Sequence, residues 1–121
     1  MKKNIALVSG GFDPLHRGHI QYMKAAKVYS DYLIVALNSD DWLQRKKKFF
    51  FMSWQERVGI IENLSFVDQV IAFDDSDDSA SDSISESLKI ADQVLFCNGG
   101  DRSNNNCQEL NDFENDPRVT F

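Results

Sequence analysis

Two histidines three residues apart are the side chains of this sequence best suited to chemistry. His16 and His19 lie in residues 10–19, which read GGFDPLHRGH, and Gly18 stands between them. Imidazole N–H groups donate hydrogen bonds, and fixed donors of this kind stabilise the charge that builds up on oxygens during group transfer. We therefore interpret the two histidines as ligands of phosphate groups, held in the first turn of a helix.

The position of this segment along the chain supports the same interpretation. It follows the apolar run 5–8, which is typical of a buried strand, and a helical pattern begins near Gly18. Ligands of parallel sheets bind beyond the carboxyl ends of the strands, where a helix N-terminus offers free amides to an anion. Gly10 and Gly11 would let the backbone approach such a ligand closely.

Two other interpretations of the histidines stay open, namely a metal-binding pair and two structural side chains. Zinc requires further ligands, and Cys97 and Cys107 lie far away without metal-binding spacing. We expect no metal bound by protein ligands alone. The segment also differs from a P-loop, which needs a following Gly-Lys-Ser/Thr, and from the Gly-x-Gly-x-x-Gly dinucleotide fingerprint.

Alternating strand and helix patterns predict the fold that would position these residues. Helical patterns begin near residues 18, 53, 84 and 107, and residues 53–56 form a capping box. Their alternation with strands predicts one doubly wound α/β domain over residues 1–121, with a parallel sheet of about five strands and helices on both faces. The predicted strands contain residues 5–8, 32–37, 70–73, 94–97 and 118–121.

Two charged segments interrupt this alternation. Residues 74–87 carry six acidic side chains and no basic one. This favours a solvated, mobile loop that leads into a helix with a negative N-terminus over a cation site, because the spacing fits no EF-hand. Residues 45–51 read RKKKFFF. A nucleic-acid patch and an exposed face are alternatives, but in this acidic chain we favour a local anion-binding loop.

The composition limits the classes of function. The chain has 121 residues and a formal net charge of −6, which argues against a general nucleic-acid partner. No apolar run approaches the roughly 20 residues that cross a bilayer, so we expect no membrane partner. Two cysteines are too few for a disulfide scaffold, which predicts a reducing, cytoplasmic setting.

Residues 10–19 resemble the Gly-x-Phe-Asp-x-x-His-x-Gly-His signature of the cytidylyltransferase-like nucleotidyltransferases. The resemblance implies a Rossmann-like fold. It extends over most of the chain through weaker matches at residues 38–40 (Asn-Ser-Asp), Lys46, residues 56–57 (Glu-Arg), residues 67–70 (Val-Asp-Gln-Val) and residues 98–102 (Asn-Gly-Gly-Asp-Arg).

The resemblance implies transfer of CMP or AMP from CTP or ATP to a small phosphorylated acceptor, a sugar or alditol phosphate, with release of pyrophosphate and with Mg²⁺ on the triphosphate. It makes His16, His19 and Lys46 the catalytic residues. Asp40, Arg57 and Arg17 become candidate contacts for the acceptor or the phosphates. The implied nucleotide-binding residues are Gly10, Gly11, Phe12, Asp13, Gly18, Asn98, Gly99, Gly100, Asp101 and Arg102.

Some of these roles have alternatives, and one family feature is missing. Asp101 also suits the N-cap of the next helix, and Arg57 also suits a surface or interface position. The family carries a Ser/Thr-rich motif opening a C-terminal helix, whereas residues 118–121 have no equivalent. The alternatives to catalysis are therefore a nucleotide-binding module and an oligomeric scaffold. The uncovered sheet edge, together with the interface role of residues 67–70 in the family, predicts a homodimer.

Overall fold

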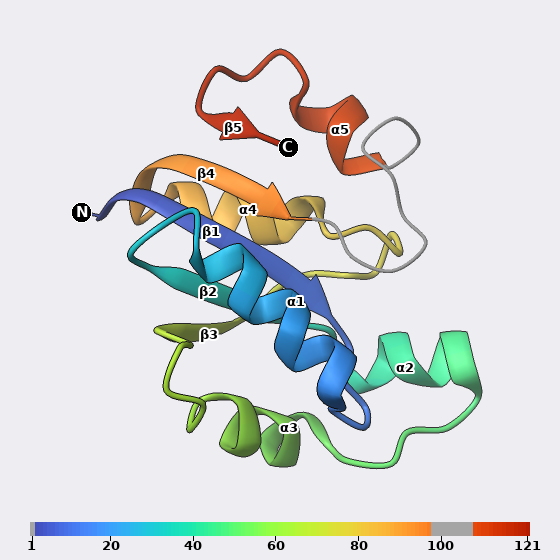
Figure 1. Cartoon of the computed structure of the whole chain (residues 1–121). Coiled ribbons are helices and arrows are strands. Elements are labelled where there is room, and N and C mark those ends of the chain that lie inside the picture. The colour runs from blue at the N-terminus through green and yellow to red at the C-terminus, as the bar shows by residue number, and fades with distance from the viewer. Residues whose placement is uncertain (1, 98–107) are drawn as a thin grey trace.

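A parallel five-stranded sheet forms the centre of the protein, in the order β3-β2-β1-β4-β5. The computed structural model describes residues 2–97 and 108–121 (Figure 1). The doubly wound α/β fold predicted from the apolar runs is confirmed, and each predicted strand is present. The strands are β1 Lys2–Gly10, β2 Leu33–Leu37, β3 Gln69–Ala72, β4 Ala91–Cys97 and β5 Val119–Thr120.

Helices cover both faces of this sheet, as the alternation predicted (Figure 1). One face carries α1 Arg17–Lys27 and α3 Trp54–Ile61, whose apolar side chains pack on β1 and β2. The other face carries α4 Ser81–Leu88 and α5 Gln108–Phe113. No helix in residues 2–97 and 108–121 is long and apolar enough to cross a membrane.

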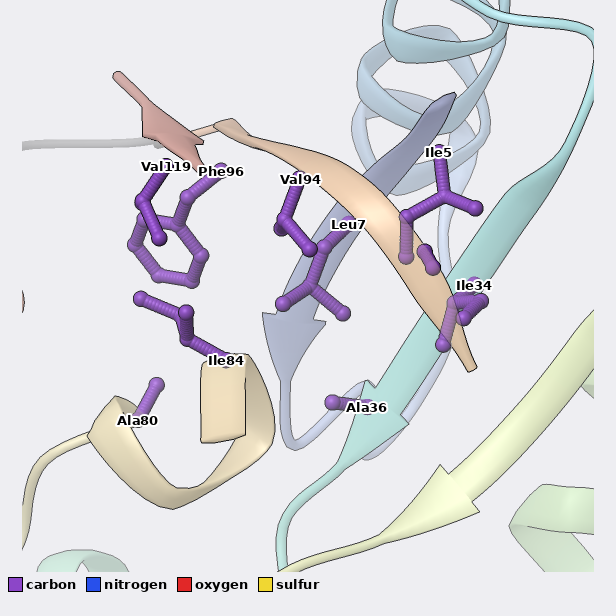
Figure 2. Close-up of a cluster of buried hydrophobic side chains, with 10 residues drawn as sticks. Ile5, Leu7, Ile34, Ala36, Ala80, Ile84, Val94, Phe96 and Val119 are labelled. Atoms are coloured by element: carbon purple, nitrogen blue, oxygen red, sulfur yellow. The ribbon is translucent and has the colours of Figure 1, made fainter. Parts of the chain in front are cut away.

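Alternate residues of β1 supply two separate cores, because successive side chains of a strand point to opposite faces. Ile5 and Leu7 belong to the core under α4, whereas Ala6 and Val8 belong to the core under α1. Figure 2 shows the first core, with Ile84 of α4 pointing toward Phe96 of β4. Burial on both faces explains why the central strands are continuously apolar in the sequence.

The sequence interpretation missed the helix α2 Asp40–Lys47, which includes part of the segment taken for a loop. Ser39 caps this helix, since its hydroxyl oxygen accepts a hydrogen bond from the Trp42 amide at 3.1 Å. Acidic residues occupy its first turn and basic residues its last, as the helix dipole favours. Lys48 ends it in a left-handed conformation, with φ of 68°.

The acidic segment is less solvated than the loop predicted for it, whereas the helix predicted to follow that loop is present. Asp75 is only 5% exposed, and residues 81–87 lie within α4. Ser83 and Ser87 are fully buried, and each hydroxyl donates to a backbone carbonyl three or four residues earlier. This packing could not be predicted from the sequence, because the buried side chains are polar and form their hydrogen bonds with nearby backbone carbonyls.

Candidate active site

The two histidines form the cap of α1, at the carboxyl end of the sheet. Nδ1 of His16 accepts a hydrogen bond from the Gly18 amide at 3.0 Å, and Nδ1 of His19 accepts one from the His16 amide at 3.2 Å. Two amides at the helix start are thereby satisfied by imidazoles, in the reciprocal pattern of a capping box. The pattern predicted the helix start but gave no sign that the histidines themselves would cap it.

This arrangement determines which ring nitrogen can donate to a ligand. A neutral imidazole that accepts at Nδ1 carries its proton on Nε2. His16 and His19 stack with ring centroids 3.7 Å apart and planes 22° apart, so the two imidazoles are held together at the start of α1. A Cβ at Gly18 would lie 2.9 Å from Cε1 of His16, so a larger residue at this position would displace the His16 ring.

Phe12 supports the histidine pair from the protein interior. Its ring contacts the His19 ring edge-to-face, with centroids 4.9 Å apart, and the side chain is buried. Its backbone has φ of 51°, and a Cβ on Gly10 would lie 2.8 Å from the Phe12 ring. Gly10 and Phe12 therefore act here as packing partners that place His19, whatever further contact they make with a ligand.

Burial lowers the pKa of His19 below its ordinary value of 6.5, and the neighbouring His16 imidazole lowers it further. The folded protein therefore binds this proton less readily than the unfolded chain does. The free energy of unfolding is therefore expected to fall as the pH drops from 7 through 6.5, the ordinary pKa of the unfolded chain, to the lowered pKa of the folded state. Below that lowered pKa, His19 causes no further change in stability.

Urea unfolding at neutral pH and near pH 5.5 measures this effect. His19→Gln is the matched variant, because glutamine at this third helical position can keep the capping box but does not titrate. The loss of stability on acidification should be smaller in His19→Gln than in the parent protein. Equal losses in the two proteins would contradict the role given to His19.

Asp13 anchors a neighbouring segment. Its carboxylate accepts hydrogen bonds from the amides of Phe51 and Met52, at 2.6 and 2.8 Å. The ammonium group of Lys47 lies 3.7 Å from the same carboxylate and also donates to the Asp13 carbonyl. In this structure Asp13 ties the segment after α2 to the histidine motif.

The structure separates the lysines of α2 by their contacts. Lys46 is exposed, and its ammonium group lies 5.8 Å from the centroid of the Trp42 ring. Lys47 contacts the motif through Asp13, and the sequence interpretation did not single it out. Adjacent residues of a helix point about 100° apart and therefore have different surroundings. Recognising α2 in the sequence would have indicated that Lys46 and Lys47 make different contacts.

Arg57 is buried, with a side chain that is 0% exposed, so its interpretation as a surface residue is wrong. Nη1 donates to the carbonyls of Gly11 and Asn38, at 3.0 and 2.7 Å, and Nε donates to the Met52 carbonyl at 3.0 Å. Nη2 pairs with Asp40 at 2.6 Å. Arg57 thus joins the ends of β1 and β2, the start of α2 and the segment before α3.

Asp75 holds the end of β2 from the opposite side. Its carboxylate accepts hydrogen bonds from Nδ2 of Asn38 at 3.0 Å, and from the amide and the hydroxyl of Ser39, both at 2.8 Å. Arg45 secures the same loop, since Nη2 donates to the Asp75 carbonyl at 2.8 Å and pairs with Asp78 at 3.0 Å. Arg45 is therefore committed to this loop, although its segment was predicted to bind anions.

Replacing Asp75 by alanine should lower the free energy of unfolding by about 3 kcal/mol, because it leaves buried donors without a charged acceptor. Chemical denaturation measures the loss. Asp74→Ala is the matched control, since Asp74 is exposed in the same loop and should matter much less. Equal effects of the two substitutions would contradict the buried role of Asp75.

The remaining predicted site residues lie at the edge of this arrangement or outside it. Arg17 is the first residue of α1 and is exposed. Asn98, Gly99, Gly100, Asp101 and Arg102 lie outside the described residues. The part of the chain that is described brings no three His, Cys, Asp or Glu side chains together as a metal site.

Comparison with known proteins identifies a family that matches most of the chain. The family model described as cytidylyltransferase-like matches residues 7–110. The chain belongs to the cytidylyltransferase-like family. That span contains the histidine motif, α2 and Arg57, and it confirms the resemblance inferred from residues 10–19.

Two relatives illustrate the range of this family. Glycerol-3-phosphate cytidylyltransferase of Bacillus subtilis (strain 168) is 42% identical over 71 residues, covering 59% of this chain and 54% of that protein. Bifunctional protein HldE of Helicobacter pylori (strain P12) is 40% identical over 76 residues, covering 61% of this chain and 16% of that protein. This cytidylyltransferase-like chain thus spans about half, or less, of these relatives.

A solved structure shares the fold. The lipopolysaccharide core biosynthesis protein of Thermoplasma volcanium GSS1 superposes with a TM-score of 0.71, covering 96% of this chain and 89% of that one. At 24% identity this likeness shows the fold alone.

Proposed function

We propose that this protein is a nucleotidyltransferase that transfers CMP or AMP from CTP or ATP to a small phosphorylated acceptor and releases pyrophosphate. One observation carries the proposal: His16 and His19 accept amide hydrogen bonds at Nδ1, which leaves two stacked Nε2–H donors at the start of α1. The family match and the name of the Bacillus relative support the same class of reaction.

The chemistry requires little beyond positioning and charge stabilisation. An acceptor phosphate oxygen attacks the α-phosphorus, the bond to the β-phosphate oxygen breaks, and pyrophosphate leaves with the bonding electrons. Negative charge increases on the α-phosphoryl oxygens and on the leaving group. Two fixed imidazole N–H donors placed at these oxygens would stabilise that charge without reorganising during the reaction.

Other residues take supporting parts in this proposal. Lys46 would bring a cation to the phosphates from the last turn of α2, and Lys47 would hold that turn against Asp13. Residues 98–102 would line the base and ribose. Mg²⁺ enters as the counter-ion of the triphosphate, held by phosphate oxygens, as is common for this hard cation. A cytoplasmic homodimer completes the proposal, and light scattering would measure its mass.

A pyrophosphate-release assay tests the proposal. The protein is incubated with Mg²⁺, with CTP, ATP, GTP or UTP, and with glycerol 3-phosphate or a series of sugar phosphates. We expect pyrophosphate release that depends on one nucleotide and one class of acceptor. Nucleotide binding without turnover for any acceptor would overturn the proposal and favour a nucleotide-binding module. Absence of any nucleotide binding would favour a scaffold.

A further inference from the structure

The acidic segment, residues 74–87, has no part in the chemistry proposed above, but it contacts α2 at two places. Its Asp75 carboxylate accepts hydrogen bonds from Asn38 and from Ser39, the residue that caps α2. Arg45 lies in the last turn of α2, and its Nη2 donates to the Asp75 carbonyl at 2.8 Å and to the Asp78 carboxylate at 3.0 Å. The acidic segment therefore holds both the start and the last turn of this helix.

The acidic segment is itself held in place, so it can serve as a fixed support. The Asp77 carboxylate accepts hydrogen bonds from the amide and the hydroxyl of Ser79, at 3.0 and 2.8 Å. It also accepts one at 3.2 Å from Nε2 of Gln108 in α5. Asp78 has φ of 65°, a left-handed conformation that aspartate adopts more readily than most residues. The carboxylate that meets Arg45 is thus presented by a defined turn.

Helix α2 depends on such contacts for its direction. It has eight residues, fewer than the about 12–15 that an isolated helix needs, and Leu43 is its buried residue. One buried side chain cannot fix the direction of a helix, because the helix can still turn about that point. Polar contacts on either side of Leu43 must therefore supply the constraint.

Arg45 and Lys47 hold opposite sides of the last turn of α2. Residues two apart in a helix point about 200° apart. Arg45 is held by the acidic segment, whereas the ammonium group of Lys47 lies 3.7 Å from the carboxylate of Asp13 in the histidine motif. Lys46 stands between them in the sequence and points about 100° away from each. Its direction is set by the two contacts beside it.

We propose that Arg45 is a positioning residue that fixes the last turn of α2 against the acidic segment, and thereby the direction of Lys46. This role rests on the proposed function, in which Lys46 brings a cation to the phosphates. Arg45 acts through Lys46 and touches no substrate. Its loss should slow transfer, because a small misplacement of a group in a site costs a large factor in rate.

Hydrogen exchange measured by mass spectrometry tests the constraint on α2 without any substrate. In Arg45→Met, a peptide that covers α2 should exchange about fivefold faster than in the parent protein, whereas a peptide that covers β1 should change much less. Methionine keeps a high helix propensity, so a change in propensity would not explain the result. Parent-like exchange of α2 in this variant would overturn the proposal.

Arg118→Met is the matched control. Both arginines pair with one aspartate near the surface, and their side chains are 42% and 54% exposed for Arg45 and Arg118. The two variants should therefore lose similar, small amounts of stability. Only the Arg45 variant should show faster exchange in α2. Equally fast exchange of α2 in Arg118→Met would contradict a specific role of Arg45.

Steady-state kinetics test whether the fixed helix matters for transfer. Arg45→Met should lower kcat by about tenfold and change KM for the nucleotide by less than about twofold, because Lys46 would act mainly on the transition state. Arg45→Lys should recover part of kcat, since one ammonium group can still reach one of the two acceptors. Arg118→Met should keep the kcat of the parent protein. Unchanged kcat in Arg45→Met would overturn the link to Lys46.

A double-variant cycle tests the contact with Asp78. Asp78→Asn removes the charge, and asparagine tolerates the left-handed backbone at this position. It should lower kcat by about threefold, and Arg45→Met/Asp78→Asn should be no slower than Arg45→Met alone. A further loss in the double variant would contradict this contact.

Failure of the proposed function would give a different result. A parent protein that releases no pyrophosphate with any nucleotide and acceptor would refute nucleotidyl transfer. The exchange of α2 would still decide whether Arg45 fixes this helix, since that measurement needs no substrate.

Discussion

Replacing His16 by serine should lower kcat/KM for nucleotidyl transfer by about 10²–10³-fold, the usual effect of removing one donor from a developing oxyanion. Serine is a good N-cap, so this variant keeps a side-chain acceptor for the amides at the start of α1. The imidazole Nε2–H is lost, and a serine hydroxyl is too short to replace it. Steady-state kinetics with the preferred nucleotide and acceptor measure the change.

Gln21→Ala provides the control for this substitution, because Gln21 is exposed on the same helix. It should leave kcat/KM unchanged. Thermal unfolding of the His16→Ser variant shows whether the fold is kept. Undiminished turnover by a folded His16→Ser protein would contradict the role of the imidazole.

Replacing Arg57 by methionine should lower the free energy of unfolding by about 3 kcal/mol, because it leaves backbone carbonyls in the interior without their charged donor. Arg57 is fully buried and donates to three backbone carbonyls besides its pair with Asp40. Methionine fills much of the volume but donates nothing. Arg57→Lys should also destabilise the protein, because one ammonium group cannot reach all of these acceptors.

Urea unfolding measures the loss, and Arg118→Met is the matched control. Arg118 pairs with Asp116 at 2.8 Å, but its side chain is 54% exposed, so its replacement should matter far less. If the Arg57 and Arg118 variants lose equal stability, Arg57 does not hold the strand ends together as described.

The sequence predicted the features that depend on local pattern. Continuous apolar runs revealed the strands because β1 and β2 are buried on both faces, and residues 10–19 revealed the family. The sequence pattern did not reveal α2, because Leu43 is the only buried residue of this helix and no apolar stripe indicates it. Ser39 and the charges at both ends of this helix were the signals available.

The remaining roles arise from contacts between residues far apart in the chain. Arg57 reaches Gly11, which lies 46 residues earlier, and Asp75 reaches Asn38, which lies 37 residues earlier. A single sequence does not reveal which arginine or aspartate will be buried by such contacts. The capping role of the histidines was likewise visible only once the ring nitrogens were placed.

Transfer of a labelled nucleotide tests the central claim most directly. The protein is supplied with CTP or ATP that carries a label on the α-phosphate, together with Mg²⁺ and a phosphorylated acceptor. We expect the label to move into a nucleotidyl acceptor as an equal amount of pyrophosphate appears, and we expect the His16→Ser variant to transfer the label far more slowly. Tight nucleotide binding with no labelled acceptor, for every nucleotide and acceptor supplied, would contradict the central claim.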